Sequence, residues 1–143
     1  MSESEAEKEL RRERATAAAL EARAQTSAPI NMPLECIVTT VEQSFDLVVV
    51  IALLGKGLAG AYAERPGLNV AFLAGKDAAV RRRFTLAHEL GHHFLGHGPG
   101  FDTTSSLNDE VDPDESSANR FAAEFIAPQP AVERFISELE DSS

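Results

Sequence analysis

The sequence His-Glu-Leu-Gly-His at residues 88–92 places two imidazoles and one carboxylate where they could do metal chemistry. Side chains four residues apart lie on the same face of an α-helix, with Cβ atoms about 5–6 Å apart, so His88 and His92 can bind one ion. Glu89 lies beside this pair, where its carboxylate could take a proton from a water held at the ion. We expect zinc (Zn²⁺), because neutral imidazole together with carboxylate suits that ion. The alternative is a core helix whose two histidines only form internal hydrogen bonds.

A third ligand is expected on a second helix, predicted from Pro113 to about Ile126 and capped by Asp112. Glu115 lies on the same side of this helix as its apolar stripe, and a buried carboxylate needs a cation beside it. The stripe comprises Ala118, Phe121, Ala122, Phe125 and Ile126. Glu124 ranks second, because nine residues further on it points about half a turn away. The remaining nearby acids, Asp109, Glu110 and Asp112, belong to a polar loop predicted at residues 101–112.

The metal-binding pattern requires a helix, and residues 80–97 predict one because they contain no proline and have regularly placed apolar residues. Asp77 can cap the start of this helix. Three strands are predicted before it, at residues 45–53, 58–63 and 69–73, and the turn residues between them allow antiparallel pairing. We therefore expect an α+β fold, a small domain in which a three-stranded antiparallel sheet packs on the helix that carries the motif.

Further helices are predicted toward both ends of the chain. Residues 2–25 are rich in Glu, Arg and Ala and indicate a weakly amphipathic helix, more often solvated than packed on the domain or bound to a partner. Residues 33–44 indicate a short helix in which Cys36 packs, and residues 131–140 a final helix. The packing face of that final helix is expected to be Val132, Phe135, Ile136 and Leu139. We divide the chain into a charged N-terminal helix at residues 1–28 and a domain at residues 29–143 that carries the metal-binding pattern.

Composition limits the function classes. The 143 residues carry a net charge of −10 with a pI near 4.8, which argues against direct binding of nucleic acid or an anionic membrane. A single cysteine cannot form an intramolecular disulfide, and the N-terminus has no secretory signal pattern. The longest apolar run, residues 47–54, is too short to span a bilayer. We expect a soluble, cytoplasmic protein, and the sequence leaves its oligomeric state open.

Two blocks, residues 83–92 and 115–128, together resemble the ImmA/IrrE family of zinc metallopeptidases. The second block matches that family's pattern E-x-x-A-N-x-F-A-A, followed by an apolar pair and a proline. The resemblance covers residues 34–135 and leaves the N-terminal helix outside. It implies a small α+β fold with a three-stranded sheet, a single zinc and cleavage of a helix-turn-helix transcriptional repressor. Such repressors are often encoded beside the peptidase, in mobile elements, stress-response loci or toxin–antitoxin-like pairs.

By position, the resemblance implies that His88, His92 and Glu115 bind the zinc and that Glu89 is the general base. Asn119 lies one turn after Glu115, where similar glutamate-liganded zinc peptidases often hold an acidic residue against a ligand histidine. An asparagine oxygen can also accept an imidazole N–H, so we expect Asn119 to support a ligand from outside the centre.

Three residues could donate to the oxyanion that develops during hydrolysis, namely Tyr62, Arg83 and His97. His93 and His97 are otherwise expected at the surface or the edge of the core, because the helix turns both of them away from the ion. An alternative function is a non-catalytic binding module with a structural zinc, which would hold a DNA-binding regulator instead of cutting it. The acidic surface would attract a basic partner in either case.

Overall fold

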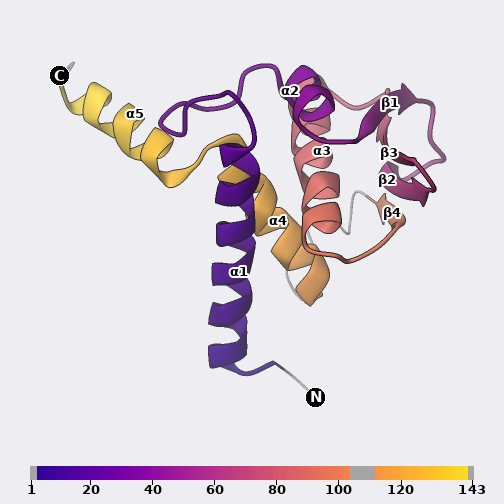
Figure 1. The fold of residues 1–143 in the computed structure, drawn as a ribbon, viewed down its shortest axis with the longest axis horizontal. Coiled ribbons are helices and arrows are strands. Elements are labelled where there is room, and N and C mark those ends of the chain that lie inside the picture. The colour runs from indigo at the N-terminus through magenta and orange to yellow at the C-terminus, as the bar shows by residue number, and fades with distance from the viewer. Residues whose placement is uncertain (1–2, 104–111, 142–143) are drawn as a thin grey trace.

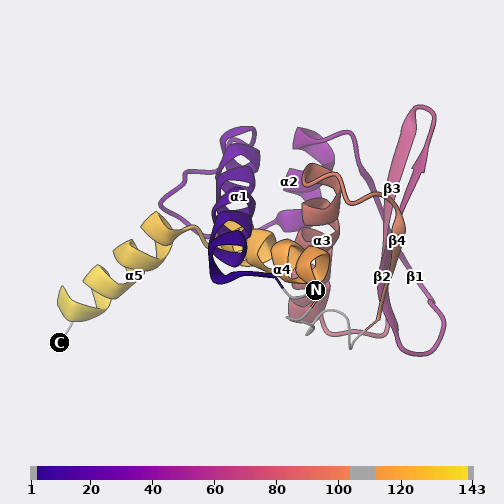
Figure 2. The same cartoon turned by 90° about the horizontal axis from the view of Figure 1, so that it is seen from below.

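The computed structural model describes residues 3–103 and 112–141. Helix α3 (Ala79–Phe94) lies at the centre, with a four-stranded sheet on one side and helices α1 (Glu5–Ala24) and α4 (Pro113–Ile126) on the other (Figures 1 and 2). Helix α2 (Ile37–Ser44) lies beside one end of α3, and α5 (Gln129–Asp141) extends away on the side opposite to the sheet. The fold is therefore α+β, as the sequence predicts.

The sheet has the strand order β1-β3-β2-β4. Its strands are β1 (Val48–Ala52), β2 (Leu58–Arg65), β3 (Leu68–Ala74) and β4 (Gly100–Thr103). Strands β2 and β3 form a hairpin whose turn is Pro66 and Gly67, and Gly67 has the positive φ of 75° that such a turn requires. Strand β4 is antiparallel to β2, whereas β1 is parallel to β3. The predicted three-stranded antiparallel sheet is therefore wrong in two respects, since a fourth strand is present and one pair of strands is parallel.

Both errors have a physical reason. Strand β1 ends at Ala52, and residues 53–57 carry the chain past β3 before β2 begins. Neighbouring strands are only about 5 Å apart, so five residues can pass one strand, and turn residues there do not require a hairpin. Strand β4 has only four residues and lies in the predicted polar loop, of which residues 104–111 fall outside the described part of the chain.

Helices α3 and α4 pack closely where Gly91 meets Phe121. A Cβ atom at Gly91 would lie 3.1 Å from the Phe121 side chain, so the glycine lets the two helices approach. Phe121 is fully buried and stacks on Phe125, and Leu86 and Leu90 of α3 belong to the same apolar core. This contact holds the start of α4 against the histidine-bearing part of α3.

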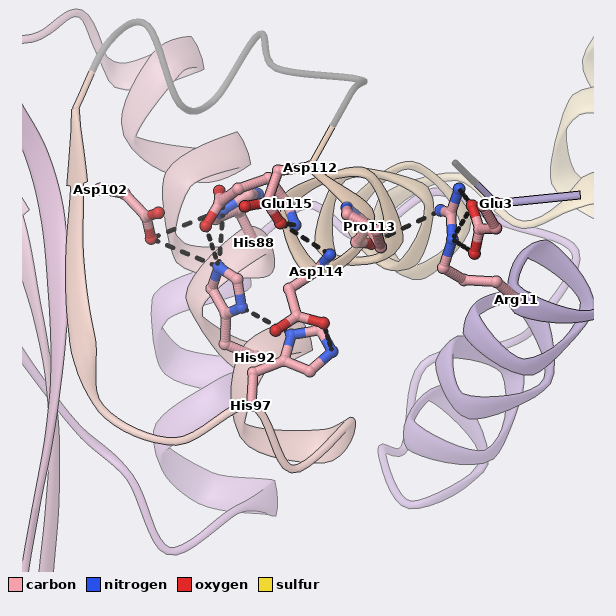
Figure 3. A network of polar contacts seen from close by, with 10 residues as sticks. All are labelled: Glu3, Arg11, His88, His92, His97, Asp102, Asp112, Pro113, Asp114 and Glu115. Atoms are coloured by element: carbon pink, nitrogen blue, oxygen red, sulfur yellow. Dashed lines mark hydrogen bonds and ion pairs between the residues drawn. The ribbon is translucent and has the colours of Figure 1, made fainter. Parts of the chain in front are cut away.

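Helix α1 packs along α4 instead of lying free in solvent. Ala15, Ala19 and Ala22, spaced by four and three residues, are fully buried on the side that faces α4 (Figure 2). The expectation of a solvated helix is wrong because small alanines let the two backbones approach, a contact that a count of large apolar residues does not reveal. Near the other end of α1, Arg11 pairs with Glu3 at 2.8 Å (Figure 3).

Arg23 at the end of α1 is buried and ties three segments together. Its guanidinium donates hydrogen bonds to the carbonyl oxygens of Phe125 at 2.8 Å, Pro29 at 2.7 Å and Met32 at 2.6 Å. A guanidinium with several fixed donors can satisfy carbonyls that the end of a helix leaves unpaired. Arg23 therefore joins α1 to the C-terminal end of α4 and to the connection before α2.

Three local expectations are also wrong. Asp77 does not cap α3, because the helix begins at Ala79 and its cap position is Ala78. Cys36 is exposed instead of packed, because α2 begins only at Ile37. The four apolar residues of α5 are 43–59% exposed, since the helix projects away from the rest of the fold. Within residues 3–103 and 112–141, no helix combines the length and apolar content needed to cross a membrane.

Candidate metal centre

Four side chains from three elements converge on one point (Figure 3). His88 and His92 come from α3, Asp102 from β4 and Glu115 from the first turn of α4. The Nε2 atoms of His88 and His92 are 3.0 Å apart. The Glu115 carboxylate lies 2.9 Å from His88 Nε2 and 3.3 Å from His92 Nε2. Asp102 Oδ2 is 3.5 Å and 3.6 Å from the same two nitrogens. We call these four residues the candidate metal centre.

This spacing fits a single ion. Donors arranged as a tetrahedron with bonds of about 2.0–2.2 Å are about 3.3–3.6 Å apart. The separations that involve the two histidine nitrogens are 2.9–3.6 Å, close to that range, and all four donor atoms lie within 4.8 Å of one another. Two imidazoles with two carboxylates form a donor set that zinc accepts. The chemistry and the distances of the four residues therefore both fit a metal ion.

The local structure explains why these side chains meet. Asp112 caps α4 as predicted, since its Oδ1 accepts the backbone N–H groups of Asp114 at 2.9 Å and Glu115 at 3.2 Å. The cap fixes the first turn, which carries Glu115. On the sheet side, Asp102 pairs with Gly60 of β2 beside a shift in strand register. Irregularities of this kind redirect side chains, and this one lies next to the strand position that brings Asp102 to the histidines.

The carboxylates control the protonation of the centre. Burial alone would lower the pKa of His88, but the side chains of Asp102 and Glu115 outweigh burial and raise that pKa to about 9. Burial would raise the pKa of Asp102, but contacts with His88 and His92 hold it well below its usual range. In the metal-free protein, protonated His88 and the Asp102 carboxylate therefore form a buried ion pair.

Glu89 is 1% exposed and points from α3 toward β2 and the cleft beside the centre. Neither of its carboxylate oxygens has a hydrogen-bond donor among the described residues. Burial and the neighbouring Asp102 and Glu115 carboxylates raise the pKa of Glu89 well above its ordinary value. Gly60 lies beside this side chain, since a Cβ atom there would be in ordinary van der Waals contact with Glu89 Oε1 at 3.4 Å. A carboxyl group with a raised pKa beside a metal centre is suited to accepting and returning a proton.

Each histidine of the candidate metal centre also has a contact at its Nδ1 atom. Asn119 Oδ1 lies 2.8 Å from His88 Nδ1, and His97 Nδ1 lies 2.8 Å from His92 Nδ1. His97 Nε2 is in turn 3.4 Å from the Asp114 carboxylate (Figure 3). Burial lowers the pKa of His97, which favours a neutral ring with one nitrogen free to accept a hydrogen bond.

The centre opens into a cleft of about 160 Å³. Strand β4 and the residues before it form one wall, and the start of α4 forms the other. The lining is strongly acidic, with Asp112 and Asp114 at the mouth in addition to the carboxylates of the centre. Phe101 on β4 is 76% exposed and supplies an apolar surface at the same cleft.

A family model described as the IrrE N-terminal-like domain matches residues 42–142, which is most of the chain. The chain belongs to this family. It is a metallopeptidase, and the resemblance to ImmA/IrrE enzymes seen in the sequence is confirmed. A search of curated proteins finds no match to the chain.

In this IrrE-like metallopeptidase, the structure brings together His88, His92 and Glu115, with Glu89 beside them. Their individual roles as ligands and base stay predictions. Glu124, the second-ranked ligand, lies outside the centre, and its nearest charged partner is Arg120 at 3.9 Å.

The candidates for stabilising an oxyanion lie in different places. Tyr62 bonds to His93 on the sheet side of α3, and Arg83 donates to the carbonyls of Leu34 and Glu35. His97 alone of the three lines the cleft, and it contacts His92 of the candidate metal centre.

Asp102 is in the candidate metal centre but is not among the site residues predicted from the sequence. It lies in a four-residue strand after a glycine-rich turn, where neither length nor apolar periodicity marks a strand. In the structure Phe101 is exposed and Asp102 is buried, as alternate residues of an edge strand can be.

Proposed function

We propose that this metallopeptidase uses zinc to cleave a helix-turn-helix transcriptional repressor, and thereby relieves repression of a mobile element, a stress-response locus or a toxin–antitoxin-like pair. The observation that carries the proposal is the candidate metal centre with the buried carboxylate of Glu89 beside it, open to a cleft. A purely structural zinc would need neither that carboxylate nor the cleft.

Peptide hydrolysis needs residues that hold the ion and a residue that transfers protons. His88, His92 and Glu115 would hold the ion, with the Asp102 carboxylate adjacent. When bound, zinc polarises the scissile carbonyl and lowers the pKa of the attacking water. Glu89 accepts a proton from that water and later passes it to the leaving amine. Its raised pKa supports this role, because the carboxyl must keep the proton between the two steps.

Two features support an extended, basic peptide as substrate. Strand β4 is an edge of the sheet and lines the cleft, so a peptide can pair with it as an additional strand that runs past the centre. The acidic residues of the cleft and the net charge of −10 attract basic segments, which DNA-binding proteins are rich in. Both features favour a repressor over an acidic or compact substrate.

The role of Glu89 is tested with Glu89→Gln. The variant should bind zinc with an affinity close to that of the unmodified protein, because the residue is not a ligand, but peptide cleavage should fall by at least about 100-fold. His88→Ala should lose both zinc and cleavage. Normal cleavage by the glutamine variant would show that another group acts as base.

The substrate is tested with purified helix-turn-helix proteins encoded next to this chain. Each is incubated with the zinc-loaded protein and analysed by intact-mass spectrometry, with Glu89→Gln and a chelator as parallel arms. Discrete fragments that vanish in both arms are expected. An intact repressor in a stable complex would instead favour the binding module, and neither fragments nor a complex would refute a repressor as the partner.

A further inference from the structure

The two ligand histidines use their rings in the same way. Each directs Nε2 into the candidate metal centre and Nδ1 outward, to a partner on another part of the chain. For His88 the partner is the amide oxygen of Asn119 on α4. For His92 it is His97, which follows the end of α3 and lies at the edge of the cleft (Figure 3). The second arrangement is unusual, because Nδ1 of an imidazole accepts a hydrogen bond only in the tautomer that carries the hydrogen on Nε2.

The geometry leaves one consistent placement of protons. A neutral imidazole that binds a metal through Nε2 carries its hydrogen on Nδ1, so His92 Nδ1–H must donate. The atom 2.8 Å away, His97 Nδ1, must then accept, and His97 carries its own hydrogen on Nε2. That nitrogen faces Asp114 Oδ1 at 3.4 Å. A hydrogen bond therefore runs outward from His92 to His97, and the Nε2–H group of His97 lies in electrostatic contact with the Asp114 carboxylate.

This placement excludes two simpler roles for His97. The residue is not one of the four donors that meet at the centre, and its Nδ1 atom is directed at His92. A direct contact with a developing oxyanion would require the Nε2–H group, which is directed at Asp114.

We propose that His97 is a positioning residue for the metal, which orients His92 and increases its basicity through the Nδ1 contact while Asp114 fixes the tautomer of His97. Contacts of this kind to a ligand histidine are commonly worth 10- to 100-fold in metal affinity. The proposal rests on the proposed function in one respect, that the centre binds zinc. It adds that the hydrogen-bond acceptor at position 97, and not merely a ring filling the space, sets how tightly zinc is held.

The test compares substitutions that keep or remove the acceptor. His97→Phe keeps a planar ring without an acceptor, whereas His97→Asn places an oxygen close to the position of Nδ1. Zinc affinity is measured on the full chain by competition with a chromophoric chelator. We expect a 10- to 100-fold loss for His97→Phe and less than about a threefold loss for His97→Asn. His93→Phe is the matched control, since it makes the same change one residue after His92 on a side chain that bonds to Tyr62, and it should leave zinc affinity unchanged.

A second readout separates positioning from folding. The cobalt-substituted proteins should show a changed visible spectrum for His97→Phe and an unchanged one for His97→Asn, because the spectrum reports the orientation of the ligands. If His97→Phe does not fold, Asp114→Ala replaces it, since Asp114 is largely exposed and its loss should weaken zinc binding several-fold. Equal zinc affinity in His97→Phe and the unmodified protein would refute the positioning role alone, as would equal losses in the Phe and Asn variants. Failure of the unmodified protein to bind zinc would instead refute the proposed function.

Discussion

Protons and metal compete for the same buried site, and this competition predicts opposite pH trends for the metal-free and metal-bound protein. The pKa of His88 rises from 6.5 to about 9 in the folded chain. Stability gained from a raised histidine pKa is fully present below the unfolded pKa and is lost as pH rises through the folded value. The metal-free protein should therefore lose stability between about pH 6.5 and 9, by about 3 kcal/mol at about 1.4 kcal/mol per pKa unit.

The same proton must leave before His88 can bind a metal. With a pKa of about 9, His88 is almost fully protonated at pH 7, so the apparent zinc affinity should rise about tenfold per pH unit between pH 6.5 and 8. The raised pKa of Glu89 acts in the same direction, since an ion nearby favours its ionised form. Chelator competition at several pH values measures the affinity, and urea unfolding of the metal-free protein over the same range measures the stability.

Asp102→Asn is the informative control. Removing this carboxylate takes away a group that raises the pKa of His88, so the rise in zinc affinity should shift to lower pH and flatten between pH 7 and 8. A zinc affinity that does not depend on pH in the unmodified protein would refute this reasoning. So would a metal-free protein that becomes more stable from pH 6.5 to 9.

Two further predictions concern the scaffold. Gly60→Ala should destabilise the fold by about 1–3 kcal/mol in urea unfolding, because its Cβ would lie 2.6 Å from Cγ2 of the buried Thr85. Adding Thr85→Ser, which removes that methyl group but keeps the hydroxyl, should restore much of the loss, and no recovery would show that the clash is not the cause. Arg23→Ala should cost about 3–5 kcal/mol, since a buried guanidinium is removed and the carbonyl oxygens of Phe125, Pro29 and Met32 lose their charged donor. A loss below 1 kcal/mol on the same assay would mean that water replaces the guanidinium.

The sequence predicts the helices of the centre well because their signals are local. The spacing of His88 and His92 is meaningful only on a helix, and α4 has a cap, a proline at its first position and an apolar stripe within fourteen residues. The apolar stripe of α4 marks its buried side, and the helical spacing places Glu115 on that side. These features depend on backbone geometry over one or two turns, which a single sequence encodes directly.

Features that depend on distant partners are not predictable in this way. Asp102 reaches the centre only because β4 pairs with β2, and a four-residue strand carries little signal before its partner is known. The β-branched residues of β1 do not reveal that β3 will lie between β1 and β2. The buried position of Arg23 depends on carbonyls about a hundred residues away, while its neighbours in the sequence are those of a solvated helix. In α5 the apolar pattern indicates a packing face but does not place anything against it.

The docking of α1 on α4 has a thermodynamic consequence. Glu115 belongs to α4, whereas the two histidines belong to α3, so an ion at the centre would join two helices that are otherwise held by side-chain packing. Any energy that ties α4 in place through α1 then contributes to ion affinity, and by linkage a bound ion must stabilise the attachment of α1 by the same amount. A segment that lies before the family-matched region, and supplies no ligand, would thus determine how well the enzyme retains its cofactor.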